Sequence, residues 1–326
     1  MSISLNSLKN FAIVNGCLFI LGYMQYSAMM YYEQKKSMFS PYSDSFVADC
    51  LFTTFLFLVR NYALIFFTDY GNRHKPRINK DPAHDPKEHY PGEFHFNVLT
   101  TTMLEAITHV ILKKTIFLNS LFLIKSPLTL VSIVTSLVTF VPVSFCFEIV
   151  LDLFHYLSHR VLHHRWFYKY AHKKHHAFQH PTTIMAFYQD PLDVILTNSI
   201  PTYLALYLTS PMISYSQFHW ILIYKSVIEV SGHCGKAMYP STSFPQFELL
   251  PKMLSIELST EDHDLHHSLN HHLHHSGKHH VHPSLDHYNY GKRFSIWDKA
   301  FGTYESPFDE KLKKKSHHVK VNAKLS

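Results

Sequence analysis

The stretch DLFHYLSHRVLHHRWFYKYAHKKHH, residues 152–176, carries seven of the 28 histidines in a chain of 326 residues. His155 and His159 are four residues apart, so on a helix both imidazoles lie on one face, as a shared metal ion requires. Glu148 and Asp152 extend the same face toward the N-terminus, and a carboxylate one turn away can accept a hydrogen bond from a ligating imidazole. The spacing therefore predicts a helix that presents metal ligands, with Asp152 supporting them.

The pattern H-x-x-H-H occurs three times in the sequence. At the histidine frequency of this chain, chance predicts about 0.2 matches. The third match lies in NHHLHHSGKHHVH (270–282), where the local histidine density makes coincidence common. We therefore keep the first two, in which Asp262 and Asp264 flank one histidine as further supporting carboxylates. Their members are His172, His175, His176, His263, His266 and His267.

Long uncharged segments surround these histidines and predict membrane spans. Residues 11–32 and 128–147 each contain enough uncharged residues for one helical crossing, and residues 50–68 form a third apolar segment interrupted by Arg60. This arginine is expected either to snorkel to the interface or to face the interior of a bundle. Residues 194–224 are too long for one crossing and are broken by prolines, so they predict two short helices that meet near Pro211.

The expected fold is all-α: an integral membrane bundle of about four to six spans or half-spans under a cytosolic, histidine-rich cap that holds a dinuclear metal site. The segment 97–124 fits either an amphipathic surface helix or half of a hairpin. Basic residues at 73–87 and 310–324 favour the cytosol for those regions. We expect an N-terminal anchor region at 1–127, a catalytic domain at 128–305 and a basic tail at 306–326.

Three further histidines enter the candidate site by position. His233 follows the predicted hairpin, which would return it to the membrane face that carries the other histidines. His163 lies four residues after His159, and His164 follows it, so these two are additional candidates. The predicted ligands are thus His155, His159, His172, His175, His176, His233, His263, His266 and His267, with His163 and His164 as possible additions.

So many imidazoles exceed the needs of one tetrahedral zinc ion, and structural zinc usually recruits cysteine. The four cysteines lie far apart and are expected to be buried thiols. Two iron ions that activate O2 for attack on a C–H bond of a membrane lipid suit this ligand set. The nine scattered glycines form no phosphate-binding loop, and the charge pattern suits membrane loops better than a nucleic-acid groove.

The residues 152–176 resemble the ordered histidine boxes of the sterol desaturase and fatty acid hydroxylase superfamily. TEDHDLHH (260–267) is similar to its last box, and NYGKRFSIWDKAFGTY (289–304) is similar to the segment that closes the domain. LNHHLHHSGKHHVHPSLDH (269–287) looks like an insertion between these two. The resemblance covers roughly residues 128–305.

The resemblance implies a di-iron oxygenase of the endoplasmic reticulum whose metal site faces the cytosol. Its electrons would come from NAD(P)H through a separate protein, cytochrome b5 or its reductase. The expected reaction is hydroxylation, oxidation or desaturation of a sterol or fatty-acyl lipid, with the sterol C-4 methyl oxidase type favoured. Two alternatives remain open: a membrane zinc transporter, because histidine-rich loops also occur in zinc carriers, and a scaffold that keeps the boxes for structural metal.

Overall fold

The computed structural model describes residues 5–39, 45–78, 91–117, 130–178, 181–237, 243–275 and 288–306. Within these ranges the chain is helical, and β pairing is limited to the isolated bridges Arg77–Lys236 and Glu257–Phe294. The longer helices are α1 (Leu5–Phe39), α2 (Phe46–Gly71), α3 (Pro91–Leu112), α5 (Leu130–Leu162), α8 (Ile200–Thr209), α9 (Tyr215–Gly232) and α11 (Thr260–His275). The all-α prediction is confirmed.

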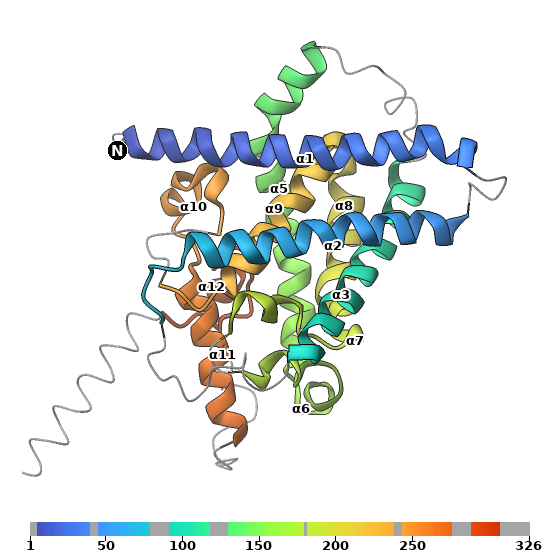
Figure 1. Ribbon diagram of the computed structural model, residues 1–326. Helices are drawn as coiled ribbons and strands as arrows, with labels where there is room; N and C mark the ends of the chain where they lie inside the picture. The colour runs from blue at the N-terminus through green and yellow to red at the C-terminus, as the bar shows by residue number, and fades with distance from the viewer. Residues whose placement is uncertain are drawn as a thin grey trace, which may run out of the picture.

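Short helical turns connect the longer helices. The α-helical ones are α6 (Arg165–Phe167), α7 (Pro191–Val194), α10 (Leu249–Met253) and α12 (Ile296–Ala300). Wider π-type turns cover Lys113–Phe117, Tyr168–His172 and Ile195–Ser199, and tighter 3-10 turns cover His175–Ala177, Thr183–Phe187, Ser210–Met212 and Pro245–Phe247. In Figure 1, α6 and α11 lie beyond α2 in the lower part of the view, whereas α1 crosses the upper part.

Three helices are long and apolar enough to cross a membrane: Ser7–Lys36, Phe46–Gly71 and Val134–Leu162. The first two contain the predicted segments 11–32 and 50–68, and the third contains residues 134–147 of the predicted segment 128–147. Large apolar side chains such as Phe55 and Val138 are exposed on them. An exposed apolar surface of this kind suits lipid rather than water.

The predicted break at Pro211 is confirmed. A 3-10 turn, Ser210–Met212, separates α8 from α9, and the hydroxyl of Ser214 accepts a hydrogen bond from the backbone N–H of Gln217 at the start of α9. The ambiguous segment 97–124 forms most of α3, which packs against α2 as half of a helical hairpin. Residues 118–129 lie outside the description.

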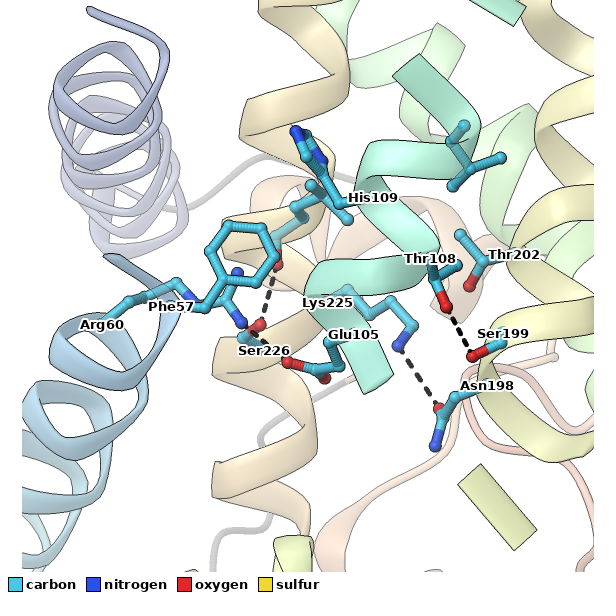
Figure 2. A pocket seen from close by; sticks show the side chains of 12 residues that line it. Phe57, Arg60, Glu105, Thr108, His109, Asn198, Ser199, Thr202, Lys225 and Ser226 are labelled. Atoms are coloured by element: carbon cyan, nitrogen blue, oxygen red, sulfur yellow. Dashed lines mark hydrogen bonds and ion pairs between the residues drawn. The ribbon is translucent and has the colours of Figure 1, made fainter. Parts of the chain in front are cut away.

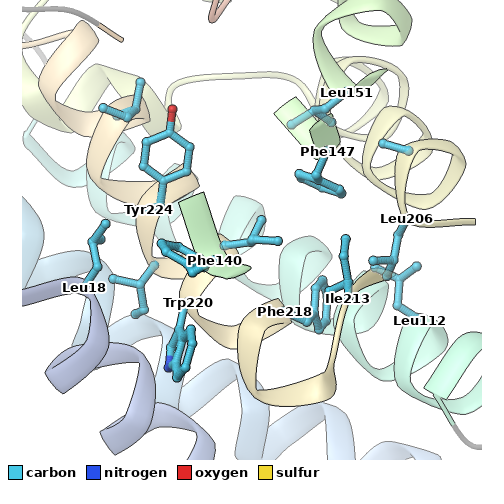
Figure 3. Close-up of a cluster of buried hydrophobic side chains, with 14 of the residues drawn as sticks. Leu18, Leu112, Phe140, Phe147, Leu151, Leu206, Ile213, Phe218, Trp220 and Tyr224 are labelled. Carbon is cyan, nitrogen blue, oxygen red and sulfur yellow. The ribbon is translucent and has the colours of Figure 1, made fainter. Parts of the chain in front are cut away.

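Aromatic side chains build the main core between α1, α5 and α9 (Figure 3). Phe140 lies 5.5 Å from Trp220, and Phe19 of α1 lies 4.9 Å from Trp220, measured between ring centroids. A Cβ atom on Gly22 would lie 2.1 Å from the Trp220 ring, so only glycine lets α1 approach α9 this closely. In a bilayer, van der Waals packing of such side chains holds the helices together, because lipid tails are as apolar as the core. The N-terminal helix is therefore packed onto the helices that lead to the histidines.

Buried polar pairs join the helices within the bundle (Figure 2). Arg60 of α2 donates to the carboxylate of Glu105 of α3 at 3.0 Å, and only 8% of the Arg60 side chain is exposed. Asn61 donates to the hydroxyl of Thr102 at 2.9 Å. Arg60 therefore faces the interior of the bundle, which is one of the two expected positions. Glu105 supplies the opposite charge that a buried arginine requires.

Several predictions from the sequence fall outside the described residues or remain untested. Residues 79–90 and 307–326 hold most of the two basic regions, and residues 276–287 hold most of the histidine-rich insertion. The division at residues 127 and 305 stays a prediction. The cysteines form no disulfide, but Cys17 and Cys146 are exposed rather than buried, because they lie on the outward faces of apolar helices.

Candidate metal centre

One face of α5 carries His155 and His159, and His163 continues it just beyond the helix end. All three side chains are buried. The helix runs without interruption from the apolar segment into the histidine stretch, as the sequence predicted. The ring centroids of successive members lie 5.1 Å and 4.9 Å apart, which is the separation expected for neighbours one helical turn apart.

Nine histidines gather into two adjacent groups, each able to hold a metal ion. Each histidine of a group offers one ring nitrogen, either Nδ1 or Nε2. Within a group, these nitrogens all lie within 4.8 Å of one another. Seven of the nine side chains are buried, and His175 and His263 are partly buried. The first group is His159, His163, His172, His176 and His266, and the second is His175, His233, His263 and His267.

The two H-x-x-H-H motifs bridge both groups because each ends in adjacent histidines that belong to different groups. His176 joins the first group and His175 the second, with ring centroids 5.4 Å apart. His266 joins the first group and His267 the second, with centroids 5.8 Å apart. Neighbouring residues point in different directions along a helix, so a histidine doublet can reach two neighbouring sites. The pattern of the motif thus fits a dinuclear centre.

Backbone carbonyls and one carboxylate fix the outer nitrogen of several imidazoles. His159 Nδ1 donates to the Tyr290 carbonyl at 2.9 Å, and His172 Nδ1 donates to the Asp193 carboxylate at 2.9 Å. Two further Nδ1 atoms donate to carbonyls: His233 to Glu229 at 2.8 Å and His266 to Tyr288 at 2.7 Å. A neutral imidazole that donates from Nδ1 presents a lone pair at Nε2, which is the form that binds metal.

The inward nitrogens of each group lie at the separation expected of ligands to one metal ion. His159 Nε2 and His172 Nε2 are 3.0 Å apart, as are His172 Nε2 and His176 Nε2, and in the second group His233 Nε2 and His263 Nε2. The first pair brings two lone pairs together, because both rings donate from Nδ1. Nitrogens about 2.1 Å from one ion at right angles would be separated by about 3 Å. The donor set therefore fits a bound metal.

Burial favours the neutral form of three of the grouped imidazoles. It lowers the pKa of His175, His176 and His263 well below the usual value, and the neighbouring imidazoles lower each pKa further. Among the described residues, the Nδ1 atoms of His175 and His176 are buried without a hydrogen-bond partner. Buried polar atoms of this kind are rare in folded proteins, and a metal ion bound at Nδ1 would account for that of His175.

The structure separates the remaining histidine candidates. His155 lies outside both groups, donates from Nδ1 to the Thr197 carbonyl at 2.8 Å and lines the small cavity between the groups. Its assignment as a ligand stays a prediction. His163 joins the first group, whereas His164 is exposed and accepts from the Trp166 N–H at the start of α6. The H-x-x-H-H motif at residues 263–267, which we kept in preference to the third match, supplies three members of the groups.

Two of the three predicted supporting carboxylates, Asp152 and Asp262, have hydrogen-bond partners other than histidine. Asp152 accepts from the backbone N–H groups of Lys292, Arg293 and Phe294, so it anchors the closing segment instead of an imidazole. Asp262 accepts from the N–H and hydroxyl of Ser259, which fits a residue in the first turn of α11. Asp264 is buried beside them. The predicted histidine contacts of Asp152 and Asp262 do not appear among the described hydrogen bonds.

Asp193 was missed as a supporting carboxylate. It follows His176 by 17 residues and lies in the short helix α7, and only 1% of the residue is exposed. Its other oxygen accepts from the Thr197 hydroxyl at 3.3 Å. No spacing rule links a residue on α7 to His172, because the two meet only through tertiary packing.

We expect Asp193→Asn to weaken metal binding by about 10–100-fold, the usual effect of losing a carboxylate that orients a ligating imidazole. The amide keeps the size of the side chain but offers a weaker acceptor to His172 Nδ1. Competition with a chelator would measure the affinity. Asp190→Asn is the matched control, because Asp190 starts the same helix and has no described histidine hydrogen bond. Equal affinities for both variants would contradict the role of Asp193.

The fold and the histidine groups define an integral membrane helical protein with a candidate dinuclear metal centre. Residues 144–303 match the family model "Fatty acid hydroxylase", and this range contains all nine grouped histidines. The chain therefore carries a domain of the sterol desaturase and fatty acid hydroxylase superfamily.

Curated relatives share this region. The fatty acid hydroxylase vlmA of Lecanicillium sp is 31% identical over 162 residues, which cover 48% of this chain and 40% of the relative. Methylsterol monooxygenase 1 of Rattus norvegicus is 28% identical over 172 residues, 51% of this chain and 48% of the relative. The C-4 methylsterol oxidase erg25 of Schizosaccharomyces pombe is 31% identical over 119 residues, 36% of this chain and 37% of the relative. The chain spans about half the length of these relatives or less. No solved structure matches it significantly.

Proposed function

We propose that the protein is an O2-dependent di-iron oxidoreductase that hydroxylates, oxidises or desaturates a sterol or fatty-acyl lipid held in the membrane. A C-4 methylsterol oxidase-like activity is favoured. The observation that carries the proposal is the convergence of nine imidazoles into two adjacent groups next to apolar helices. Nitrogen ligands of this kind suit iron, and the names of the relatives support a lipid substrate.

Iron bound by the two groups would supply the redox chemistry that attack of O2 on an unactivated C–H bond requires. The surrounding residues hold the imidazoles in the metal-binding tautomer through the carbonyls of Tyr288 and Tyr290 and the carboxylate of Asp193. Burial of these residues excludes bulk water from the reacting region. In a hydroxylation, one oxygen atom enters the lipid and the other leaves as water, which requires two electrons from a donor and two protons.

The electrons are proposed to come from NAD(P)H through a separate protein of the cytochrome b5 or b5 reductase type. A hollow of about 630 Å³ lies beside His176 and is lined in part by Lys169, Lys173 and Lys174. Lysines around an opening toward the metal groups would attract an acidic donor protein. An endoplasmic reticulum location, with the histidines facing the cytosol, belongs to the same proposal.

Metal content and oxygen consumption test this function. We expect purified full-length protein reconstituted with Fe²⁺ to hold about two irons per chain, and to consume O2 when a lipid substrate and reduced cytochrome b5 are supplied. Metal flux across proteoliposomes without oxygen uptake would support a zinc transporter instead. Bound metal with neither flux nor oxygen uptake would support a scaffold. Either of these results would overturn the oxidase proposal.

A further inference from the structure

A second cavity, of about 260 Å³, adjoins the small cavity between the histidines. Five residues line both cavities: Glu229, His233, His263, Gly291 and Lys292. Val14 of α1, Val227 and Leu258 line the larger cavity alone. The larger cavity therefore extends from the histidine groups to an apolar helix that is long enough to cross a membrane.

Lys292 places a buried cation where the two cavities meet. Its ammonium group pairs with the Glu229 carboxylate and donates to the Asn198 side-chain oxygen at 3.1 Å. An ammonium group has three N–H donors, and these described contacts use two of them. A buried ammonium group is costly unless each of its N–H donors finds a partner, so the remaining N–H beside the metal groups points to a ligand.

The surrounding charges favour a neutral oxygen over an anion as that ligand. Glu229 already compensates the charge of Lys292, so a carboxylate ligand would bring two negative groups to one buried ammonium. A hydroxyl group instead can accept from Lys292 and donate to Glu229, because it has both a hydrogen and lone pairs. The pair is therefore complementary to an alcohol.

We propose, building on the proposed function, that Lys292 and Glu229 bind the hydroxyl group of a lipid alcohol and so position a carbon near that hydroxyl for oxidation. The polar end of the cavity is also its metal end, because Lys292 and His233 line the same junction. A lipid that enters with its hydroxyl at this junction leaves its apolar body toward Val14 and Val227. Its remote end then lies away from the histidines.

Binding to the wild-type protein tests the proposal first. The probes are two matched pairs, 5α-cholestan-3β-ol with 5α-cholestane and octadecan-1-ol with octadecane, together with octadecanoate. Radiolabelled probes are measured on iron-loaded full-length protein in detergent without oxygen, so that no turnover occurs. We expect at least one alcohol to bind about tenfold or more tightly than its hydrocarbon, the effect of a hydrogen bond to a charged group. We also expect that alcohol to bind more tightly than octadecanoate.

Variants then assign the selectivity to Lys292. Lys292→Met should remove the preference for the alcohol, and Lys292→Arg, which keeps the charge, should retain part of it. Lys225→Met is the matched control, because Lys225 is also buried and donates to the same Asn198 oxygen at 3.3 Å, yet lines a different pocket (Figure 2). It should keep the preference. A thermal melt of each variant shows whether it is folded before binding is compared.

The possible outcomes separate this inference from the proposed function. The inference is overturned if no probe binds, if hydrocarbon and alcohol bind the wild type equally, if octadecanoate binds best, or if Lys225→Met loses the preference as fully as Lys292→Met. After any of these results, iron content and oxygen uptake would still test the proposed oxidase function. Conversely, alcohol selectivity that depends on Lys292 would stand even if the protein consumed no oxygen.

Discussion

Replacing His163 with alanine is expected to remove about one of two bound irons and to lower turnover by at least about 100-fold, whereas the same change at His164 leaves both within about twofold. The two residues are adjacent and the sequence treats them alike. In the structure His163 is buried in the first histidine group, and His164 is exposed at the start of a helical turn. Comparison of the His163→Ala and His164→Ala variants therefore separates the loss of a metal ligand from general effects on this segment.

His267→Ala extends the experiment to the second group and should also remove about one iron, because His267 belongs to that group alone. Elemental analysis of purified protein gives the iron content, and product analysis with reduced donor gives turnover. Membrane insertion of each variant is checked by carbonate extraction. If His163→Ala kept two irons and full turnover, His163 would not be a metal ligand.

Local spacing was enough to predict most of the site. Residues four apart on a helix share a face whatever the rest of the fold does, so His155 and His159 could be placed together on α5 before any tertiary contact was known. Hydropathy located α1, α2 and α5 for a similarly local reason. The convergence of the two H-x-x-H-H motifs was inferred only from chance frequency and from the number of membrane crossings.

The partners of the imidazoles could not be predicted. The carbonyls of Tyr288 and Tyr290 fix two imidazoles, but every residue has a carbonyl, so nothing in the sequence marks these two. Asp193 reaches His172 through the packing of α7, which no periodic pattern encodes. The expectation that Asp152 supports an imidazole was reasonable from its spacing, but three backbone N–H groups of the closing segment occupy its carboxylate.

That role of Asp152 leads to a large expected effect on stability. Its carboxylate is fully buried and accepts from the N–H groups of Lys292 at 2.7 Å, Arg293 at 2.9 Å and Phe294 at 3.1 Å. Asp152→Asn replaces one acceptor oxygen with an N–H2 group, which would face a backbone N–H donor. Loss of charged acceptors from buried donors should cost about 3–5 kcal/mol and lower the Tm on the order of 10 °C.

Ser158→Ala is the control for Asp152→Asn, because Ser158 lies on the same helix and its hydroxyl bonds only to carbonyls of its own helix turn. Its Tm should change little. Tryptophan fluorescence of the detergent-solubilised protein measures both melts. The closing segment also carries the Tyr290 carbonyl that fixes His159, so Asp152→Asn should weaken iron binding as well as lower the Tm. An unchanged Tm for this variant would mean that the three hydrogen bonds do not anchor the segment.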